Sequence, residues 1–217
     1  MYGIFLDVTG RKQAEEGHEL LAGEMSHRVK NLIAIAGALT SMTSRSAETK
    51  EDMARELTQR LTALGRAHDL VRPLPGQVET GALLGDLLSV LLTPYDDLGA
   101  FSGRIRVSVP RMGIGETAAT NLALVLHELA TNSVKHGALS ADAGLLDISC
   151  LVEDSRAVIV WTERGGPKVE APTASGGFGS QLLNRIMKHH FTGSVDYAWE
   201  PEGLIVTLNI PAVRLEQ

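Results

Sequence analysis

The stretch "ETAATNLALVLHELATNSVKHG", residues 116–137, decides the fold of this 217-residue chain. We predict one long helix that ends at Gly137, because glycine commonly follows the last residue of a helix. Leu124, Val125 and Leu129 lie on one side of this helix and are expected to pack against a core. The helix is therefore expected to be a central element of a two-layer α/β domain.

Polar residues form a stripe along the second half of the same helix. Glu128, Asn132, Lys135 and His136 stand at positions i, i+4, i+7 and i+8, which share one helix face. A carboxylate and an amide one turn apart can bind a hydrated Mg²⁺ and a triphosphate together, since Mg²⁺ prefers oxygen ligands and keeps several waters. A capped, solvated helix end would show the same stripe, so this segment alone leaves both interpretations open.

Short elements surround the long helix. The patterns before it predict a helix and a strand, and those after it predict two strands, a helix and a closing β-hairpin. In chain order their ranges are 82–95, 104–110, 145–154, 157–164, 181–190, 193–200 and 203–211.

The N-terminal part of the chain has a different pattern. Two long helices are predicted at about residues 12–43 and 51–71, with Ser46 or Thr49 as N-cap of the second. "RPLPGQ", residues 72–77, then ends the second helix, because proline cannot continue it. This part is expected to be a helical hairpin followed by a linker.

A histidine interrupts the apolar pattern of the first helix, in "GEMSHRVKNLIAIAGAL", residues 23–39. At about 100° per residue, His27 falls about 160° from the centre of the apolar seam. It shares its face with Glu24 and Lys30, three residues to either side. Periodicity alone favours a solvated helix face, although an exposed histidine beside a cation also suits a nucleophile that meets an anionic reagent. The predicted seam residues are Leu21, Met25, Val29, Leu32, Ala36 and Leu39.

Two glycine-containing stretches follow the long helix. "WTERGGP", residues 161–167, ends a strand with a glutamate and two glycines, and "SGGFG", residues 175–179, opens a helix. Exposed N–H groups at such a helix start suit phosphate groups. Either stretch alone is weak evidence, since glycine clusters are common in loops.

Composition excludes several classes of protein. The single cysteine, Cys150, rules out an internal disulfide framework and is expected to be a small core residue. A net charge of −6 without a basic block argues against nucleic acid as the main partner. We find no signal peptide and no apolar run long enough to cross a membrane, which indicates a cytoplasmic location.

In this order, the segments resemble a sensor histidine kinase over nearly the whole chain. "HRVKN" is similar to the phospho-acceptor box, "HELATNSVKH" to the asparagine box of the Bergerat-fold ATPases, and the two glycine-containing stretches to their glycine boxes. The form of these boxes, with His127 before Glu128 and with Trp161-x-Glu163, resembles the signature of the HWE subfamily.

The resemblance implies a role for each matched residue. His27 would accept the γ-phosphoryl group of ATP, Asn132 would ligate Mg²⁺, and Glu163 would accept a hydrogen bond from the adenine amino group. The remaining implied roles are phosphate contacts for Glu128, Lys135 and His136, close approach of the base at Gly165, and a lid hinge with phosphate contacts at Gly176, Gly177 and Gly179.

The general base for His27 departs from the usual pattern. Most relatives in other subfamilies place an acidic residue directly after the histidine, whereas Arg28 follows it here. Glu24, on the same helix face, and Glu128 are therefore the candidates for a catalytic carboxylate.

The sequence predicts an α+β chain in three parts. Residues 1–10 resemble the end of a PAS or LOV sensor domain, and residues 11–76 form a hairpin for dimerisation and histidine phosphotransfer. Residues 77–217 form a two-layer α/β sandwich of the Bergerat (GHKL) type that binds ATP and Mg²⁺. The expected partners are a second copy of the chain and the receiver domain of a response regulator.

Two rival functions stay open. A serine kinase of the anti-sigma-factor type shares the ATP domain but lacks a helical hairpin with an exposed histidine. A scaffold or phosphatase for a response regulator would need no kinase activity, although an intact Asn132 and Glu163 argue against it.

Overall fold

The computed structural model describes residues 26, 29–30, 32–41, 43–45, 47–71, 82–95, 103–169 and 178–216. The chain divides into two compact units, Met1–Leu57 and Thr58–Gln217. The predicted sensor-domain end, His27, Glu24, Arg28, Gly176 and Gly177 lie outside the described residues. So does the linker in which the predicted boundary after residue 76 falls, so the division into functional parts stays a prediction.

Apart from residues 47–49, the described residues of the first unit are helical. Residues 32–41 and 43–45 continue the first predicted helix, and helix α2, Lys50–Val71, confirms the second. Thr49 caps α2, because its Oγ1 accepts the N–H of Asp52 at 3.0 Å. Of the predicted seam, Leu39 is buried, whereas Val29 is 51% exposed. The seam was predicted to bury this side chain against a second hairpin, which a single chain does not supply.

The second unit contains a sheet and the helices that cover it. The predicted order of helices and strands is confirmed throughout the described part of this unit. The elements are α3 (Leu84–Leu92), η1 (Thr93–Tyr95), β1 (Ile105–Ser108), α4 (Glu116–His136), η2 (Ala138–Ser140), β2 (Leu145–Glu153), β3 (Arg156–Arg164), α5 (Phe178–His189), β4 (Ser194–Glu200), β5 (Gly203–Pro211) and η3 (Ala212–Arg214).

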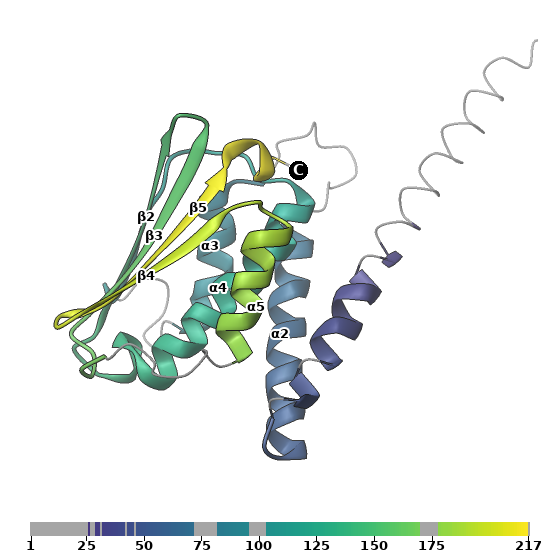
Figure 1. The fold of residues 1–217 in the computed structure, drawn as a ribbon, viewed down its shortest axis with the longest axis horizontal. Helices are drawn as coiled ribbons and strands as arrows, with labels where there is room; N and C mark the ends of the chain where they lie inside the picture. Colours follow the sequence, from purple (N-terminus) through teal and green to yellow (C-terminus); the bar gives the residue numbers. More distant parts are fainter. Residues whose placement is uncertain are drawn as a thin grey trace, which may run out of the picture. The chain divides into compact units, whose positions relative to one another are not determined.

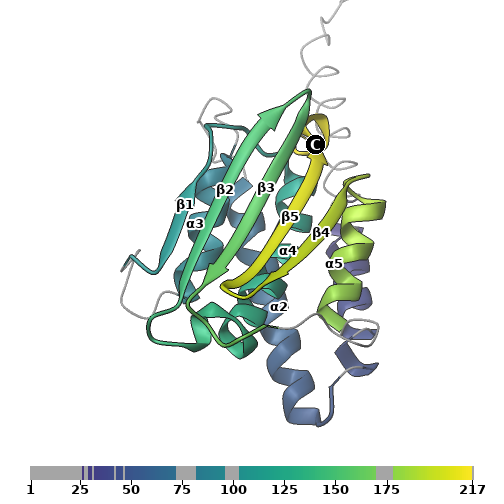
Figure 2. The same cartoon turned by 60° about the vertical axis from the view of Figure 1, so that its left-hand side comes forward.

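The sheet has five strands in the order β1-β2-β3-β5-β4. The β1–β2 pair is parallel, and the other three pairs are antiparallel. Helices α3, α4 and α5 lie on one face of this sheet (Figures 1 and 2). The predicted two-layer α/β sandwich and its closing β4–β5 hairpin are therefore confirmed.

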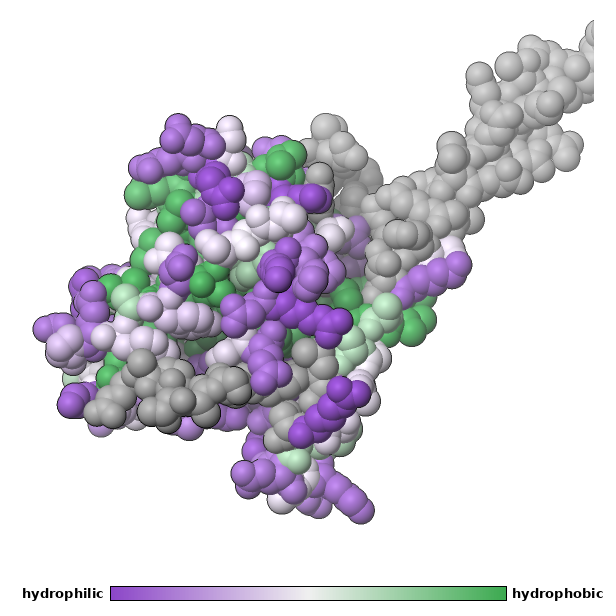
Figure 3. Space-filling view, in the orientation of Figure 1, coloured by the Kyte–Doolittle hydropathy of each residue, from purple (hydrophilic) through white to green (hydrophobic). Residues whose placement is uncertain are grey.

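Alternation along the strands explains this one-sided packing. Alternate residues are buried beneath the helices in the first part of β2, along β3 and in the second part of β5, and all of these except Glu163 are apolar. Cys150 belongs to this buried set, as predicted, whereas its neighbour Leu151 is 62% exposed on the opposite face. On the face in view in Figure 3, hydrophilic residues are spread between small hydrophobic areas.

Helix α4 occupies the centre of the core. It is buried on nearly all sides from Ala118 to Ala130, and its last turns reach a more polar environment. Within the described part of the chain, no helix combines the length and apolar character that a membrane crossing requires.

Candidate functional site

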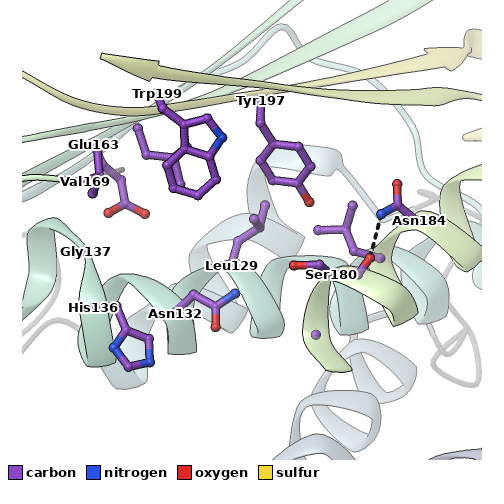
Figure 4. Close-up of a pocket in the computed structure, with 13 residues that line it drawn as sticks. Leu129, Asn132, His136, Gly137, Glu163, Val169, Ser180, Asn184, Tyr197 and Trp199 are labelled. Carbon is purple, nitrogen blue, oxygen red and sulfur yellow. Dashed lines mark hydrogen bonds between the residues drawn. The ribbon is translucent and has the colours of Figure 1, made fainter. Parts of the chain in front are cut away.

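A pocket of about 380 Å³ lies between the helices and the inner face of the sheet. Helix α4 lines one side, α5 a second, and strands β3, β4 and β5 the third (Figure 4). Four residues singled out from the sequence meet here: Asn132, His136, Glu163 and Gly179. They come from three elements that are far apart in the chain, so the fold brings the asparagine box and both glycine-containing stretches to one site.

The carboxylate of Glu163 is fixed by two protein donors. Trp161 donates its indole N–H to Oε1 at 2.9 Å, and the backbone N–H of Ala138 donates to Oε2 at 2.7 Å. Glu163 is only 4% exposed, yet it lines the pocket. Each carboxylate oxygen can accept more than one hydrogen bond, so a donor in the pocket can still reach this group.

Glycine at position 137 makes this arrangement possible. A Cβ atom at Gly137 would overlap with Oε2 of Glu163, so no larger residue fits between the end of α4 and the carboxylate. The sequence pattern predicts only the helix end at Gly137, and the contact with Glu163 is a second reason for glycine at this position.

The polar stripe of α4 divides into two groups. Asn132 and His136 are exposed and line the pocket, whereas Lys135 is exposed but does not line it. Glu128 is buried and pairs with Arg60 of α2, with Nε of Arg60 2.7 Å from Oε1 of Glu128. A Cβ at Gly179 would lie 2.6 Å from Oε2 of Glu128, so this carboxylate lies beside the pocket-lining start of α5.

The Arg60–Glu128 pair has a chemical consequence. Both side chains are buried, and a second nitrogen of Arg60, Nη2, lies 3.4 Å from Oε2. The carboxylate of Glu128 is therefore already engaged in an ion pair. The role of Glu128 as a base stays a prediction, and it would require Arg60 to release the carboxylate.

We expect substitution of Arg60 by methionine to destabilise the chain by about 3 kcal/mol, since it leaves a buried carboxylate unpaired. The double variant Arg60→Met/Glu128→Leu should recover most of this loss, because it removes both charges. Thermal unfolding of the parent and the two variants measures both effects. Equal destabilisation by the single and double variants would show that the pair itself contributes nothing.

The two described glycines of the predicted site differ. Gly179 lines the pocket. Gly165 has φ +72°, a conformation that favours glycine, and a Cβ there would lie 3.0 Å from the backbone oxygen of Ala143. The turn after β3 therefore requires glycine at 165 for its own backbone, and close approach of a base at this position stays a prediction.

Several residues of the site were missed in the sequence analysis. Tyr197 and Trp199 of β4 and Asn184 of α5 line the pocket, and Arg60 holds Glu128. The alternating aromatic residues in "YAWE" could have signalled the first two, because residues i and i+2 of a strand share a face. Nothing in the local sequence signals that Arg60 meets a residue 68 positions away.

His127 lies outside the pocket, on the opposite side of α4. Its Nδ1 is 2.6 Å from the hydroxyl of Tyr95, and only 8% of the residue is exposed. Burial lowers the pKa of His127, partly offset by the charge of Glu128. Burial likewise raises the pKa of Tyr95, so both partners are held in their neutral forms.

Stability should therefore fall as the pH drops below about 6.5, the ordinary pKa of histidine. The pKa of His127 is lower in the folded chain than in the unfolded chain. Below about pH 6.5 the unfolded chain therefore binds more protons at His127, and protonation favours unfolding. Urea unfolding at pH 7.5 and 5.5 tests this, with His127→Gln expected to show a smaller pH dependence. His190→Gln should also show a smaller pH dependence than the parent, because burial lowers the pKa of His190 as well. An identical pH dependence in His127→Gln and the parent would contradict the assignment.

The pocket offers hydrogen-bonding groups, among them the amide of Asn132 and the carboxylate of Glu163. Among the described residues, no group of three or more histidine, cysteine or acidic side chains could hold a metal ion. The amide of Asn132 points into the pocket (Figure 4) and offers one oxygen ligand. A cation bound here would need most of its ligands from the bound molecule and from water, which is how Mg²⁺ binds with phosphates.

Comparison with known protein families gives a match in the first half of the chain. Residues 24–111 match the family described as HWE histidine kinase. Over this segment the chain is similar to that family. The matched segment ends before His127, Trp161 and Glu163, which carry the sequence resemblance to HWE kinases.

Longer relatives cover those residues as well. The chain is 34% identical to a blue-light-activated histidine kinase of Brucella anthropi, over 97% of this chain and 43% of the relative. It is also 34% identical to blue-light-activated histidine kinase 1 of Erythrobacter litoralis, over 97% of this chain and 58% of the relative. The chain thus spans about half the length of these curated relatives.

The fold has a solved counterpart. The chain is similar to the histidine kinase domain of the Erythrobacter litoralis EL346 blue-light-activated histidine kinase, with a TM-score of 0.55 and 14% identity. The similarity covers 86% of this chain and 98% of that domain. The helix and sheet arrangement of this chain is therefore similar to that of a solved histidine kinase domain, in agreement with the predicted fold.

Proposed function

We propose that this chain is the catalytic part of a bacterial sensor histidine kinase. It transfers the γ-phosphoryl group of ATP to His27 in the presence of Mg²⁺ and then passes this group to an aspartate of a response regulator. The observation that carries the proposal is the fixed carboxylate of Glu163 in a pocket opposite Asn132, in a chain similar to histidine kinases over nearly all its length.

The residues of the pocket fit ATP. The carboxylate of Glu163 can accept a hydrogen bond from the adenine amino group, and α4 would hold Mg²⁺ through Asn132 at the phosphate end. Gly179 lines the pocket at the start of α5, where backbone N–H groups would donate hydrogen bonds to phosphate groups. When bound, Mg²⁺ would neutralise part of the charge on the phosphates.

The reaction is mainly a matter of position. A ring nitrogen of His27 forms a bond to the γ-phosphorus as the bond from that phosphorus to the bridging oxygen breaks, and ADP leaves. Such a transfer needs little covalent chemistry from the protein, so in-line placement and charge neutralisation dominate. The linker at residues 72–77 would allow the ATP-binding part to bring the phosphate to His27.

Two exposed side chains support pairing through the helical hairpin. Val29 and Ile33, one helical turn apart, are 51% and 65% exposed. Large apolar side chains of this kind are favourably covered by a second chain. A homodimer would form a four-helix bundle, which leaves His27 on the outward face for a receiver domain.

We expect Glu163→Ala to weaken ATP binding by about ten- to a hundredfold and to narrow the preference for ATP over GTP. A charge-assisted hydrogen bond contributes about 1.5–3 kcal/mol, and about 1.4 kcal/mol corresponds to one decade. GTP presents a carbonyl oxygen where ATP presents an amino group. The substitution therefore removes a repulsion between this oxygen and the carboxylate when GTP binds. Competition of both nucleotides against a fluorescent ADP analogue measures this.

The ratio of the two affinities also controls for folding. The substitution leaves the N–H groups of Trp161 and Ala138 without their acceptor, which destabilises the variant. Partial unfolding weakens the apparent binding of ATP and of GTP by the same factor and leaves the ratio of the two affinities unchanged. An unchanged ratio would therefore mean that the adenine is recognised elsewhere.

Incubation with γ-labelled ATP and Mg²⁺ tests the proposed function. Histidine phosphorylation predicts label that is lost in acid and kept in base, and that moves to a receiver domain added later. Acid-stable label would favour the serine kinase of the anti-sigma-factor type. Absence of both label and ATP binding would favour a scaffold or phosphatase.

A further inference from the structure

Two rows of side chains cross the inner face of the sheet and meet at the pocket. Val206 of β5 pairs with Trp161 on one side and with Tyr197 on the other. Leu204, two residues earlier, pairs with Trp199, and the same register extended by two residues places Glu163 on its other side. Glu163 and Trp199 thus lie two strand spacings apart, about 10 Å, on the same face.

The exposure of these rows changes from one side of the sheet to the other. Trp161 and Val206 are fully buried, as inner-face residues under helices should be. Trp199 is 37% exposed although it lies on the same face, and Tyr197 is half-buried. Both side chains line the pocket, so part of their uncovered surface faces the cavity.

The two rings form one aromatic wall. Their planes are only 13° apart, and their centroids are 6.1 Å apart. Figure 4 shows both rings above the pocket, with Trp199 next to Glu163 and with Leu129 of α4 below. A flat ligand between the wall and Leu129 would bury apolar surface on both sides while its edge meets the carboxylate.

We propose that Trp199 and Tyr197 of β4 form the surface on which the purine base stacks while Glu163 binds its amino group. This inference rests on the proposed function and adds two specificity residues to its site. A purine suits the wall because stacking is independent of the hydrogen-bonding edge, which stays free for the carboxylate. The aromatic rings would then set affinity for any purine, and Glu163 would set the choice of adenine.

Substitutions at Trp199 separate stacking from simple packing. We expect Trp199→Leu, which keeps an apolar side chain but loses the ring, to weaken ATP and ADP by about tenfold each. Trp199→Phe should stay within about threefold of the parent, and Tyr197→Leu should show a smaller loss than Trp199→Leu. The ATP/GTP preference should stay the same in all three, unlike in Glu163→Ala. Competition against a fluorescent ADP analogue gives all these affinities.

Two controls show where a loss arises. Inorganic tripolyphosphate carries no base, so it should compete equally well against the parent and Trp199→Leu. Leu151→Ala removes an exposed apolar side chain from the opposite face of the sheet and should leave nucleotide binding unchanged. The chain has two tryptophans, and Trp161 is buried, so a fluorescence change on ADP binding should disappear in Trp199→Phe.

The outcomes distinguish the two proposals. If the parent binds ATP and ADP but Trp199→Leu binds them equally well, the stacking proposal is overturned and the proposed function stands. If Trp199→Leu weakens the binding of tripolyphosphate as much as that of the nucleotides, the substitution acts on the fold and the stacking proposal is also overturned. A parent chain that binds neither nucleotide would overturn both.

Discussion

Replacement of His27 by alanine is expected to abolish autophosphorylation while ATP binding stays within about twofold of the parent. His27 is predicted to lie opposite the apolar seam of its helix, so truncation removes a nucleophile without a core contact. A substitution away from the core changes stability by about 0.5 kcal/mol or less. Incorporation of γ-labelled phosphate and competition against a fluorescent ADP analogue measure the two properties separately.

A second histidine provides the matched control. His189, exposed at the end of α5, should be replaceable by alanine with label incorporation unchanged. Label that persists in His27→Ala would show that another residue is the acceptor. Loss of ATP binding in the same variant would show that His27 has a role in nucleotide binding instead.

Replacement of Asn132 by alanine or aspartate should remove the dependence of ATP binding on Mg²⁺. Asn132 is exposed, and its amide points into the pocket from a helix whose other face is core, so the fold should be retained. Loss of a metal ligand beside the phosphates is expected to cost at least about tenfold in affinity for Mg·ATP. Calorimetry with ATP, in the presence of Mg²⁺ and in the presence of a chelator, gives the ratio of the ATP affinities with and without the metal.

The control for this prediction lies two residues along the same helix. Val134 is 42% exposed and does not line the pocket, so Val134→Ala should bind Mg·ATP as the parent does. If Asn132→Ala keeps the same ratio of affinities with and without Mg²⁺, then Asn132 is not a metal ligand.

Local patterns predicted the elements of the fold because each element carries its own periodicity. Strands β2 and β3 are short runs rich in β-branched and apolar residues, and α4 has an apolar majority with a polar end, so type and order could be assigned before any tertiary contact was known. The solvent exposure of Val29 could not be predicted in this way. An apolar seam shows that a side chain should be covered but does not show whether its own chain covers it.

The site was predictable where its chemistry follows a motif. Asn132, His136, Glu163 and Gly179 were identified from short stretches and meet in one pocket. The support around them was not predictable, because it depends on pairing between distant segments. Trp161 orients Glu163 across two residues of one strand, but Ala138 and Gly137 reach the same carboxylate from the end of α4. The Arg60–Glu128 pair likewise required the packing of α2 in three dimensions.

The central claim is that His27 receives a phosphoryl group from ATP, and peptide mapping by mass spectrometry tests it most directly. The intact chain is incubated with ATP and Mg²⁺, digested under alkaline conditions that preserve phosphohistidine, and analysed for phosphorylated peptides. We predict one phosphorylated site, at His27, which disappears after brief acid treatment. Acid-stable phosphate on a serine or threonine, or phosphate on a histidine other than His27, would contradict the account.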